Sequence, residues 1–158
     1  MIQKTTYPAA TDEEAIAANQ CMKFDCIMMS AICEAGLETL SGKDAFIYLI
    51  NHEAPADVPV GTFHTADVPY WLGGTLTLRA QYETDDDRAM NETMKTYFEN
   101  FITNGDPNGE GLAQWDKYDG SYRYFFIGDN TYEVVEIPQD RGDFWAGYIN
   151  TRKSSAND

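Results

Sequence analysis

The stretch that most constrains the fold is the hexapeptide at residues 45–50, Ala-Phe-Ile-Tyr-Leu-Ile, which is apolar at every position. A strand with one face in water alternates apolar and polar side chains. A continuous apolar run is instead typical of a strand covered on both faces, as in the centre of a parallel sheet. Only residues 122–127 and 132–137 have the composition of further strands. We therefore expect a sheet of few strands and interpret the chain as part of a larger fold.

Two helices are predicted, one on each side of this strand in the sequence. Thr11 and Glu14 fit a capping box, in which the threonine oxygen accepts the Glu14 amide and the Glu14 carboxylate accepts the Thr11 amide. This box begins a helix expected over residues 12–40. A second helix is expected over residues 88–103, with one apolar face and with Gly105 just beyond its end. The buried face of the first helix is marked by Met22, Cys26, Met29 and Cys33.

The C-terminal part of the chain predicts a β-hairpin followed by a tail. Residues 123–127 and 132–137 are joined by a four-residue turn, Gly-Asp-Asn-Thr. Residues 138–158 carry a short aromatic segment and are expected to form a weakly structured tail. A length of 158 residues fits one domain. The predicted fold class is therefore α/β, a single domain over residues 1–158 with few strands flanked by helices.

The composition excludes several classes of protein. The formal net charge is −15, from 26 acidic residues against 11 lysines and arginines, and such a surface repels the phosphates of nucleic acids. The simplest interpretation of this charge is a soluble surface, and a halophilic or cation-binding origin is the alternative. An apolar content of 43% can fill a core, which argues against disorder. No stretch approaches the roughly 20 apolar residues of a membrane span, and the N-terminus does not have the pattern of a signal peptide.

The three cysteines, Cys21, Cys26 and Cys33, lie within the first predicted helix. An odd number in one helix does not form a disulfide framework. We expect these side chains to pack in the core rather than bind a metal, and they favour a reducing compartment, the cytoplasm. The segment that starts at Asp106 resembles the opening of a calcium loop, but Lys117 stands where the pattern requires glutamate. We therefore expect neither a metal nor another cofactor.

The candidate catalytic residue is His64. A lone histidine is more often structural or solvated than catalytic. This one, however, lies on a loop after the apolar strand, on the side of the sheet where open α/β folds place their chemistry. Phe63 precedes it, and Asp67 follows three residues later. The sequence therefore predicts a general base at His64, with Phe63 and Asp67 supporting its loop.

Two motifs carry a resemblance to a known family. Residues 63–70, Phe-His-Thr-Ala-Asp-Val-Pro-Tyr, combine a histidine with small residues, a carboxylate and an aromatic residue. Residues 97–108 have the pattern Tyr-Phe-x-x-Phe-x-x-x-Gly-Asp-Pro-Asn, with Trp115 a short way on. With the helix after Tyr7-Pro8, they resemble the C-terminal portion of the type-B carboxylesterases, the para-nitrobenzyl esterase and cholinesterase-like branch of the α/β-hydrolases. The resemblance covers residues 7–137 and implies the C-terminal part of an α/β-hydrolase fold.

The resemblance implies that His64 is the histidine of a serine esterase triad. In such enzymes a serine attacks the ester carbonyl, and the histidine takes the serine proton and gives it to the leaving alcohol. The order along the chain is serine, acid, histidine, yet residues 1–63 contain no G-x-S-x-G elbow. Only Ser30 and Ser41 precede the histidine, and we nominate no triad acid. Thr65 stands where glycine is common in the family, which leaves the local backbone geometry to be determined.

We therefore expect a C-terminal segment of a serine carboxylesterase that supplies the histidine, lacks the nucleophile and the acid, and is inactive alone. One alternative is a subunit of a split esterase, completed by a second chain through strand pairing. The other is a non-catalytic, cholinesterase-like binding or interaction module. The expected partners are the missing N-terminal portion or second chain and, only in the completed enzyme, an ester substrate. Exposed strand edges and a half-covered apolar strand also predict self-association.

Overall fold

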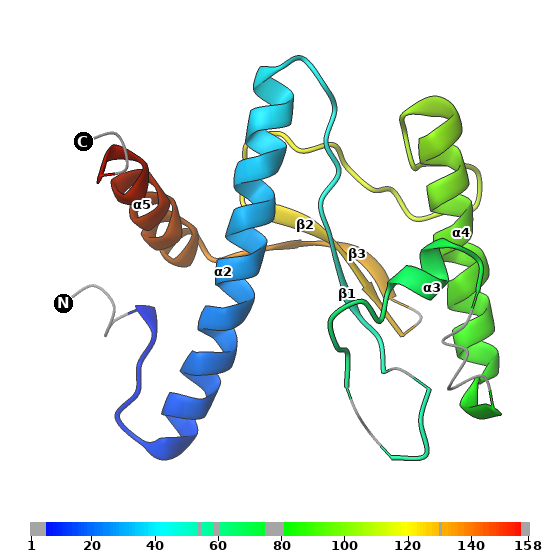
Figure 1. Ribbon diagram of the computed structural model, residues 1–158, viewed down its shortest axis with the longest axis horizontal. Helices are drawn as coiled ribbons and strands as arrows, with labels where there is room; N and C mark the ends of the chain where they lie inside the picture. The colour runs from blue at the N-terminus through cyan, green and yellow to red at the C-terminus, as the bar shows by residue number, and fades with distance from the viewer. Residues whose placement is uncertain (1–5, 54, 59–60, 75–80, 130, 156–158) are drawn as a thin grey trace. The chain divides into compact units, whose positions relative to one another are not determined.

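A computed structural model of the protein describes residues 6–53, 55–58, 61–74, 81–129 and 131–155 (Figure 1). The elements in chain order are helix α2 (Asp12–Leu40), strand β1 (Tyr48–Asn51), helices α3 (Val68–Trp71) and α4 (Asp85–Asn104), strands β2 (Arg123–Gly128) and β3 (Thr131–Glu136), and helix α5 (Gln139–Ser155). The chain is thus a small mixture of helices and strands, with a three-stranded sheet.

Two compact units make up this structure. The first contains the chain up to Ile47, Tyr118–Arg123 and the chain from Glu136, and the second contains Tyr48–Lys117 and Tyr124–Val135. Each unit is built from separate stretches of the chain, so the division does not fall at one linker between successive domains. The interpretation of residues 1–158 as one domain stays a prediction.

The sheet has the strand order β1–β2–β3. β1 runs parallel to β2, with Tyr48 opposite Phe125 and Ile50 opposite Ile127. Two residues separate β2 from β3, which is too short for the crossover that parallel strands need, so these strands form the predicted hairpin. The turn is shorter than the four residues predicted, because Gly128 and Thr131 belong to the strands.

β1 begins later than predicted and lies at an edge of this sheet. Residues 45–47 precede the strand without belonging to it, and Tyr48, Leu49 and Ile50 are half-buried. The expectation of a strand covered on both faces is therefore not met within the part of the chain that the structure describes. The strand order also places β1 at an edge of the described sheet, with β2 as its neighbour, rather than at the centre.

Helix α2 starts where predicted but caps its amides differently. The Thr11 side chain accepts the Glu14 amide at 3.2 Å, as expected, whereas the Glu14 carboxylate accepts the amide of Ala10 at 2.7 Å instead of that of Thr11. The buried stripe is also displaced from the predicted one, because Cys26 is exposed and the buried side chains follow the 3–4 residue spacing from a different start. The buried residues of α2 are Asp25, Met28, Met29, Ile32 and Ala35.

Residues 139–155 form helix α5, so the prediction of a weakly structured tail is wrong for this segment. Long-range contacts hold the helix against α2 and the segment before it. Arg141 donates from Nε to Asp25 Oδ2 at 2.7 Å, and Trp145 donates from Nε1 to the Tyr7 hydroxyl at 2.6 Å. Trp145 and Tyr7 are both buried. Since the partners lie more than a hundred residues away, the local sequence did not indicate this helix.

The core of the second unit is aromatic. Trp115 stacks on Phe125 with ring centroids 5.0 Å apart, and the Tyr97 hydroxyl donates to the Ala113 carbonyl at 2.7 Å. Helix α4, which lies beside α3 (Figure 1), begins three residues before the predicted start because Thr84 and Asp87 form a capping box there. It ends at Gly105, whose φ of 74° is the left-handed cap that the sequence predicted.

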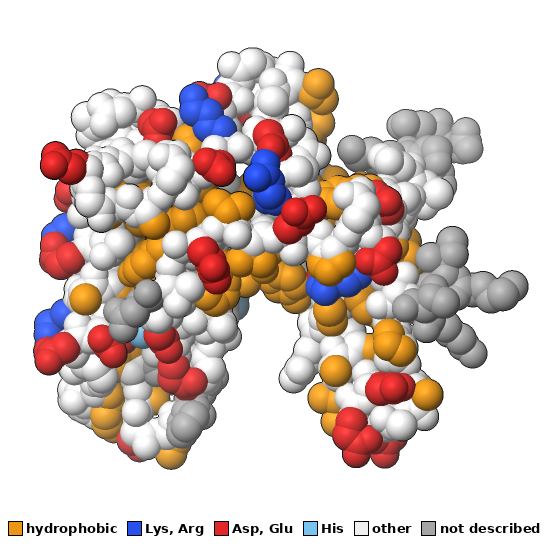
Figure 2. All heavy atoms as spheres, turned by 180° about the vertical axis from the view of Figure 1, so that it is seen from behind, with side chains coloured by type: hydrophobic (Ala, Val, Ile, Leu, Met, Phe, Trp, Pro, Cys, Tyr) orange, Lys and Arg blue, Asp and Glu red, His pale blue; other side chains and the backbone are white. Residues whose placement is uncertain are grey.

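The surface carries many acidic side chains, as the net charge of −15 requires. Figure 2 shows Asp and Glu side chains spread over the visible face, with apolar side chains exposed between them. Among the described residues, no helix combines the length and the apolar character needed to cross a membrane.

Candidate functional site

His64 lies in a turn between β1 and α3, and its side chain is exposed. The turn is closed by backbone hydrogen bonds from the Ala66 amide to the Phe63 carbonyl at 3.0 Å and from the Val68 amide to the Thr65 carbonyl at 3.3 Å. Thr65 has a φ of 71°, a left-handed conformation that costs a residue with a Cβ atom about 1–2 kcal/mol. This is the position at which the family commonly has glycine, so Thr65 keeps the glycine-like backbone geometry in spite of its side chain.

Asp67 binds the turn to strand β1. Its Oδ2 atom accepts the Tyr48 hydroxyl at 2.7 Å, and the same hydroxyl accepts Trp71 Nε1 at 3.1 Å. Burial raises the pKa of Tyr48, and the hydrogen bond to Asp67 raises it further, so the phenol stays protonated and donates. The partner of Asp67 is Tyr48, and no hydrogen bond joins its carboxylate to His64 among the described residues, so its role in supporting the catalytic histidine stays a prediction.

Phe63 contributes through its backbone, whose carbonyl accepts the Ala66 amide. Its side chain is 37% exposed. The residues just before it bind the other end of the turn to the end of β1. The Thr62 hydroxyl donates to the His52 carbonyl at 2.8 Å, and the Gly61 amide donates to Glu53 Oε1 at 2.7 Å. The turn that carries His64 is thus held on both sides.

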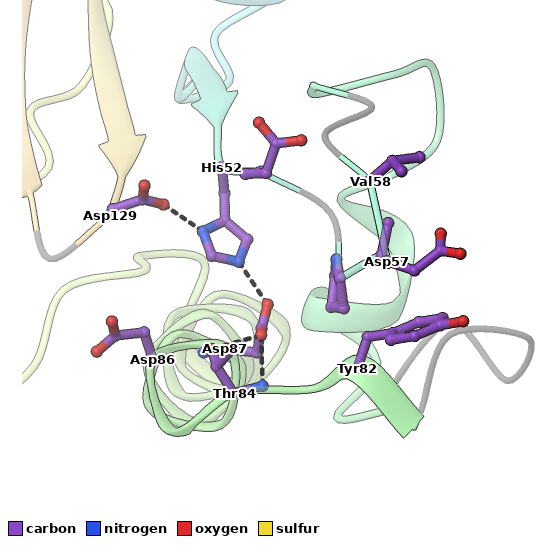
Figure 3. Close-up of a pocket in the computed structure, with 11 residues that line it drawn as sticks. His52, Asp57, Val58, Tyr82, Thr84, Asp86, Asp87 and Asp129 are labelled. Atoms are coloured by element: carbon purple, nitrogen blue, oxygen red, sulfur yellow. Dashed lines mark hydrogen bonds and ion pairs between the residues drawn. The ribbon is translucent and has the colours of Figure 1, made fainter.

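The second histidine, His52, lies directly after β1 and is buried, with 6% of its surface exposed. Its Nε2 atom lies 2.6 Å from Asp87 Oδ1, and its Nδ1 atom contacts Asp129 Oδ1 (Figure 3). Ionised carboxylates only accept hydrogen bonds, so this arrangement favours the imidazolium form, in which both ring nitrogens donate. Burial alone would lower the pKa of His52, but the hydrogen bonds and charges of Asp87 and Asp129 outweigh burial and raise it.

Asp87 connects several elements through its two oxygens. Oδ2 accepts the Thr84 amide at 2.7 Å and the Thr84 hydroxyl at 2.6 Å, and Oδ1 accepts the Tyr70 hydroxyl at 2.8 Å in addition to His52. Burial would raise the pKa of Asp87, but the bonds from Thr84, His52 and Tyr70 together lower it. The carboxylate therefore stays ionised at neutral pH. Burial and the bond to Asp87 raise the pKa of Tyr70, which stays protonated.

A pocket of about 300 Å³ lies beside His52 and Asp87. Figure 3 shows the His52 ring between Asp129 and Asp87, with Tyr82 and Asp57 on the opposite wall. The lining includes five carboxylate residues, Glu53, Asp57, Asp86, Asp87 and Asp129, and it does not include His64. Within the part of the chain that the structure describes, no group of three or more His, Cys, Asp or Glu side chains could hold a metal ion.

The sequence analysis did not nominate His52, Asp87 or Asp129. A signal was present, because His52 is the first residue after β1, at the carboxyl end of a strand that pairs in parallel. The same positional argument predicts His64, which lies further along the loop. No local pattern connects His52 to Asp87, 35 residues later, or to Asp129, 77 residues later.

The sequence model of the carboxylesterase family matches residues 5–145, most of the chain. The chain belongs to the carboxylesterase family. It is 28% identical over 110 residues to the medium-chain fatty acyl-CoA hydrolase precursor of Anas platyrhynchos, a match that covers 66% of this chain and 19% of that protein. It is 31% identical over 80 residues to carboxylesterase 1F of Mus musculus, covering 51% of this chain and 14% of that protein.

A third relative, liver carboxylesterase 1 of Oryctolagus cuniculus, is 36% identical over 62 residues, covering 39% of this chain and 11% of that protein. The chain thus spans no more than about a fifth of the length of these curated relatives. The carboxylesterases are ester hydrolases with an α/β-hydrolase fold. The three-stranded mixed structure is compatible with a part of that fold.

Proposed function

We propose that this chain is the C-terminal segment of a serine carboxylesterase of the para-nitrobenzyl esterase and cholinesterase-like branch, in which His64 is the general base. The observation that carries the proposal is the turn itself. An exposed histidine follows a strand that pairs in parallel and precedes Thr65, whose backbone is left-handed. The turn is bound to Tyr48 of β1 on one side and to His52, just after β1, on the other. Such a turn presents the imidazole to solvent, and so to a substrate, in a defined place.

In the proposed mechanism, His64 takes the proton of a serine as that serine attacks the ester carbonyl, and then protonates the leaving alcohol. The two serines that precede His64 do not fit the nucleophile. Ser30 donates to the Cys26 carbonyl within α2 at 2.9 Å, and Ser41 donates to the Glu38 carbonyl at 2.7 Å. Both hydroxyls therefore satisfy carbonyls of a helix and its end, which supports a nucleophile supplied by another segment.

The carboxylate that orients the histidine must also come from elsewhere under this proposal. Asp67 is the nearest carboxylate in the sequence, but Tyr48 occupies its Oδ2 atom at 2.7 Å. The role that the structure supports for Asp67 is to hold the turn. We accordingly expect the isolated chain to bind no ester productively and to hydrolyse none.

The test is hydrolysis of a short-chain nitrophenyl ester by the purified chain, alone and after co-expression with the N-terminal portion of a carboxylesterase that carries the G-x-S-x-G elbow. We expect background turnover from the chain alone and restored turnover from the pair, abolished by His64→Ala. His52→Gln in the same pair measures how much turnover depends on the other histidine. Turnover by the isolated chain that depends on His64 would overturn the proposal.

A split esterase, in which the remaining parts belong to a second chain, is favoured by one observation. β1 is the edge strand of the described sheet, and a half-buried apolar edge offers its backbone to a further strand. The same edge supports the proposed self-association, which light scattering over a concentration series tests. If a co-purified partner binds the chain equally well with His64→Ala and no esterase activity accompanies it, the non-catalytic module is the better description.

A further inference from the structure

We propose that His52 is a positioning residue for His64: its ion pair with Asp87 holds both ends of the turn on which His64 stands. The inference rests on the proposed function, because positioning matters for a base that acts. We call His52, Asp87 and Asp129 the His52 cluster. Its members come from the end of β1, from the first turn of α4 and from the residue that follows β2.

The first end of the turn is bound to the backbone of His52. The Thr62 hydroxyl donates to the His52 carbonyl at 2.8 Å, two residues before His64. The adjacent Gly61 amide donates to Glu53 Oε1 at 2.7 Å. Residues 52 and 53 therefore determine where the chain enters the turn, and the ring of His52 determines where residue 52 lies.

The second end of the turn is bound to the partner of His52. Tyr70, six residues after His64, is 5% exposed and donates its hydroxyl to Asp87 Oδ1 at 2.8 Å. The same oxygen lies 2.6 Å from His52 Nε2. The rings of Tyr70 and His52 also contact edge to face, with centroids 5.3 Å apart. One carboxylate oxygen thus joins the entry and the exit of the turn, and loss of the His52–Asp87 bond uncouples the two ends.

The charge of His52 is what makes the pair strong. Three charged or titratable groups contact the ring: Asp87 of α4, Asp129 after β2 and Tyr70 of α3. Glu53 on its own segment and Asp57 and Asp86 across the pocket add further negative charge nearby. The acidic groups in this set are carboxylates, so the protonated ring is a cation that offsets part of their negative charge. The ring loses that role when it loses its proton.

The carboxylate of Asp87 keeps other hydrogen-bond donors when the His52 ring is absent. Its Oδ2 atom is occupied by Thr84, and Oδ1 keeps the Tyr70 hydroxyl when the ring is absent. Helix α4 therefore retains its capping box in a variant at position 52. The expected consequence is a loosening confined to residues 61–71 rather than a loss of the fold.

The experiment measures amide hydrogen exchange in the full chain at neutral pH, with His52→Gln as the variant and His64→Gln as the matched control. We expect His52→Gln to speed exchange of the Ala66 and Tyr70 amides by about tenfold or more, as for the loss of a charge-assisted hydrogen bond. The Phe125 and Ile127 amides of β2 should change much less. His64→Gln, which removes the other histidine and leaves the cluster intact, should leave all four unchanged.

Two further measurements keep the proposal open to refutation. If His52→Gln does not fold, a pH series on the unaltered chain serves instead. Exchange of the Ala66 amide, corrected for its intrinsic rate, should then accelerate relative to the β2 amides as His52 loses its proton. In the co-expressed pair, His52→Gln should lower kcat about tenfold or more while KM changes less than threefold, as expected for misplaced catalytic geometry.

The outcomes separate this proposal from the one on which it rests. Equal acceleration at all four amides, or none at any, overturns the positioning role whatever the activity shows. An inactive pair with local loosening of the turn keeps the contact network and rejects the esterase role. An active pair whose kcat is indifferent to His52→Gln rejects positioning and keeps the esterase role.

Discussion

Arg141→Met tests the packing that makes α5 a helix rather than a tail. Asp25 is fully buried, at 0% exposure, and accepts hydrogen bonds from the Tyr7 hydroxyl at 2.6 Å and from the Arg141 guanidinium. Methionine replaces most of the aliphatic stem of arginine, so the variant removes the charge and the donors more than the packing. It leaves a buried carboxylate with one neutral donor.

The expected loss follows from that unpaired charge. Removing one partner of a buried ion pair destabilises a protein by about 3–5 kcal/mol. The retained bond from Tyr7 places Arg141→Met at the lower end, at about 3 kcal/mol. Because m-values in urea are roughly 1–3 kcal/mol per molar for small proteins, the unfolding midpoint should fall by about 1–3 M. Far-UV circular dichroism in a urea series measures it.

Two control variants show whether the loss comes from the buried ion pair. Lys43→Met removes the cation of an exposed pair, whose partner is Glu38, and should change stability far less than Arg141→Met does, because solvent screens exposed pairs. The double variant Asp25→Leu and Arg141→Met removes both charges and should recover part of the loss. A loss from Arg141→Met no greater than that from Lys43→Met would show that the buried pair does not hold α5 in place.

Three further predictions concern the second unit. The raised pKa of His52 means that the folded state binds the proton more tightly than the unfolded state. The stability that this proton contributes is therefore complete below the unfolded pKa of about 6.5 and is lost as pH rises through the folded pKa. Urea unfolding across this range should show the decline, and His52→Gln should abolish it. Thr65→Gly should raise the unfolding free energy by about 0.5–1 kcal/mol, since glycine adopts a φ of 71° without strain, and a measured loss would contradict this. Tyr97→Phe should cost about 1–2 kcal/mol, because the buried ring loses its bond to the Ala113 carbonyl, and thermal or urea unfolding decides it.

Local chemistry predicted the elements well. Thr11 marks the start of α2, Gly105 marks the end of α4, and the hairpin of β2 and β3 follows from two short apolar runs around a polar turn. Each of these signals lies within a few residues of the structure that it determines. The burial of α2 was predicted less well, since the position of a stripe on a helix depends on what packs against it. Asp25 illustrates this, because a charged residue is buried there only through its pairing with Arg141.

The site was predicted in part for the same reason. A short motif brings His64 and Asp67 into one segment, but the partner of Asp67, Tyr48, lies 19 residues earlier. The His52 cluster joins residues 35 and 77 positions apart, and no spacing rule connects them. The features that were predicted depend on residues close together in the sequence, and the contacts that were missed join residues far apart.

The contacts that hold the His64 turn share one property that bears on the proposed function. The residues that make these contacts all belong to the second unit and lie within residues 48–87: Tyr48, His52, Glu53, Tyr70 and Asp87. The described contacts of the turn therefore come from chain that is near to it in the sequence. In the proposed enzyme, the partner segment supplies the nucleophile, the acid and the oxyanion donors. Under the proposed function, the affinity between the two segments and the geometry of His64 are then separate properties, and a variant of the His52 cluster should alter the second without altering the first.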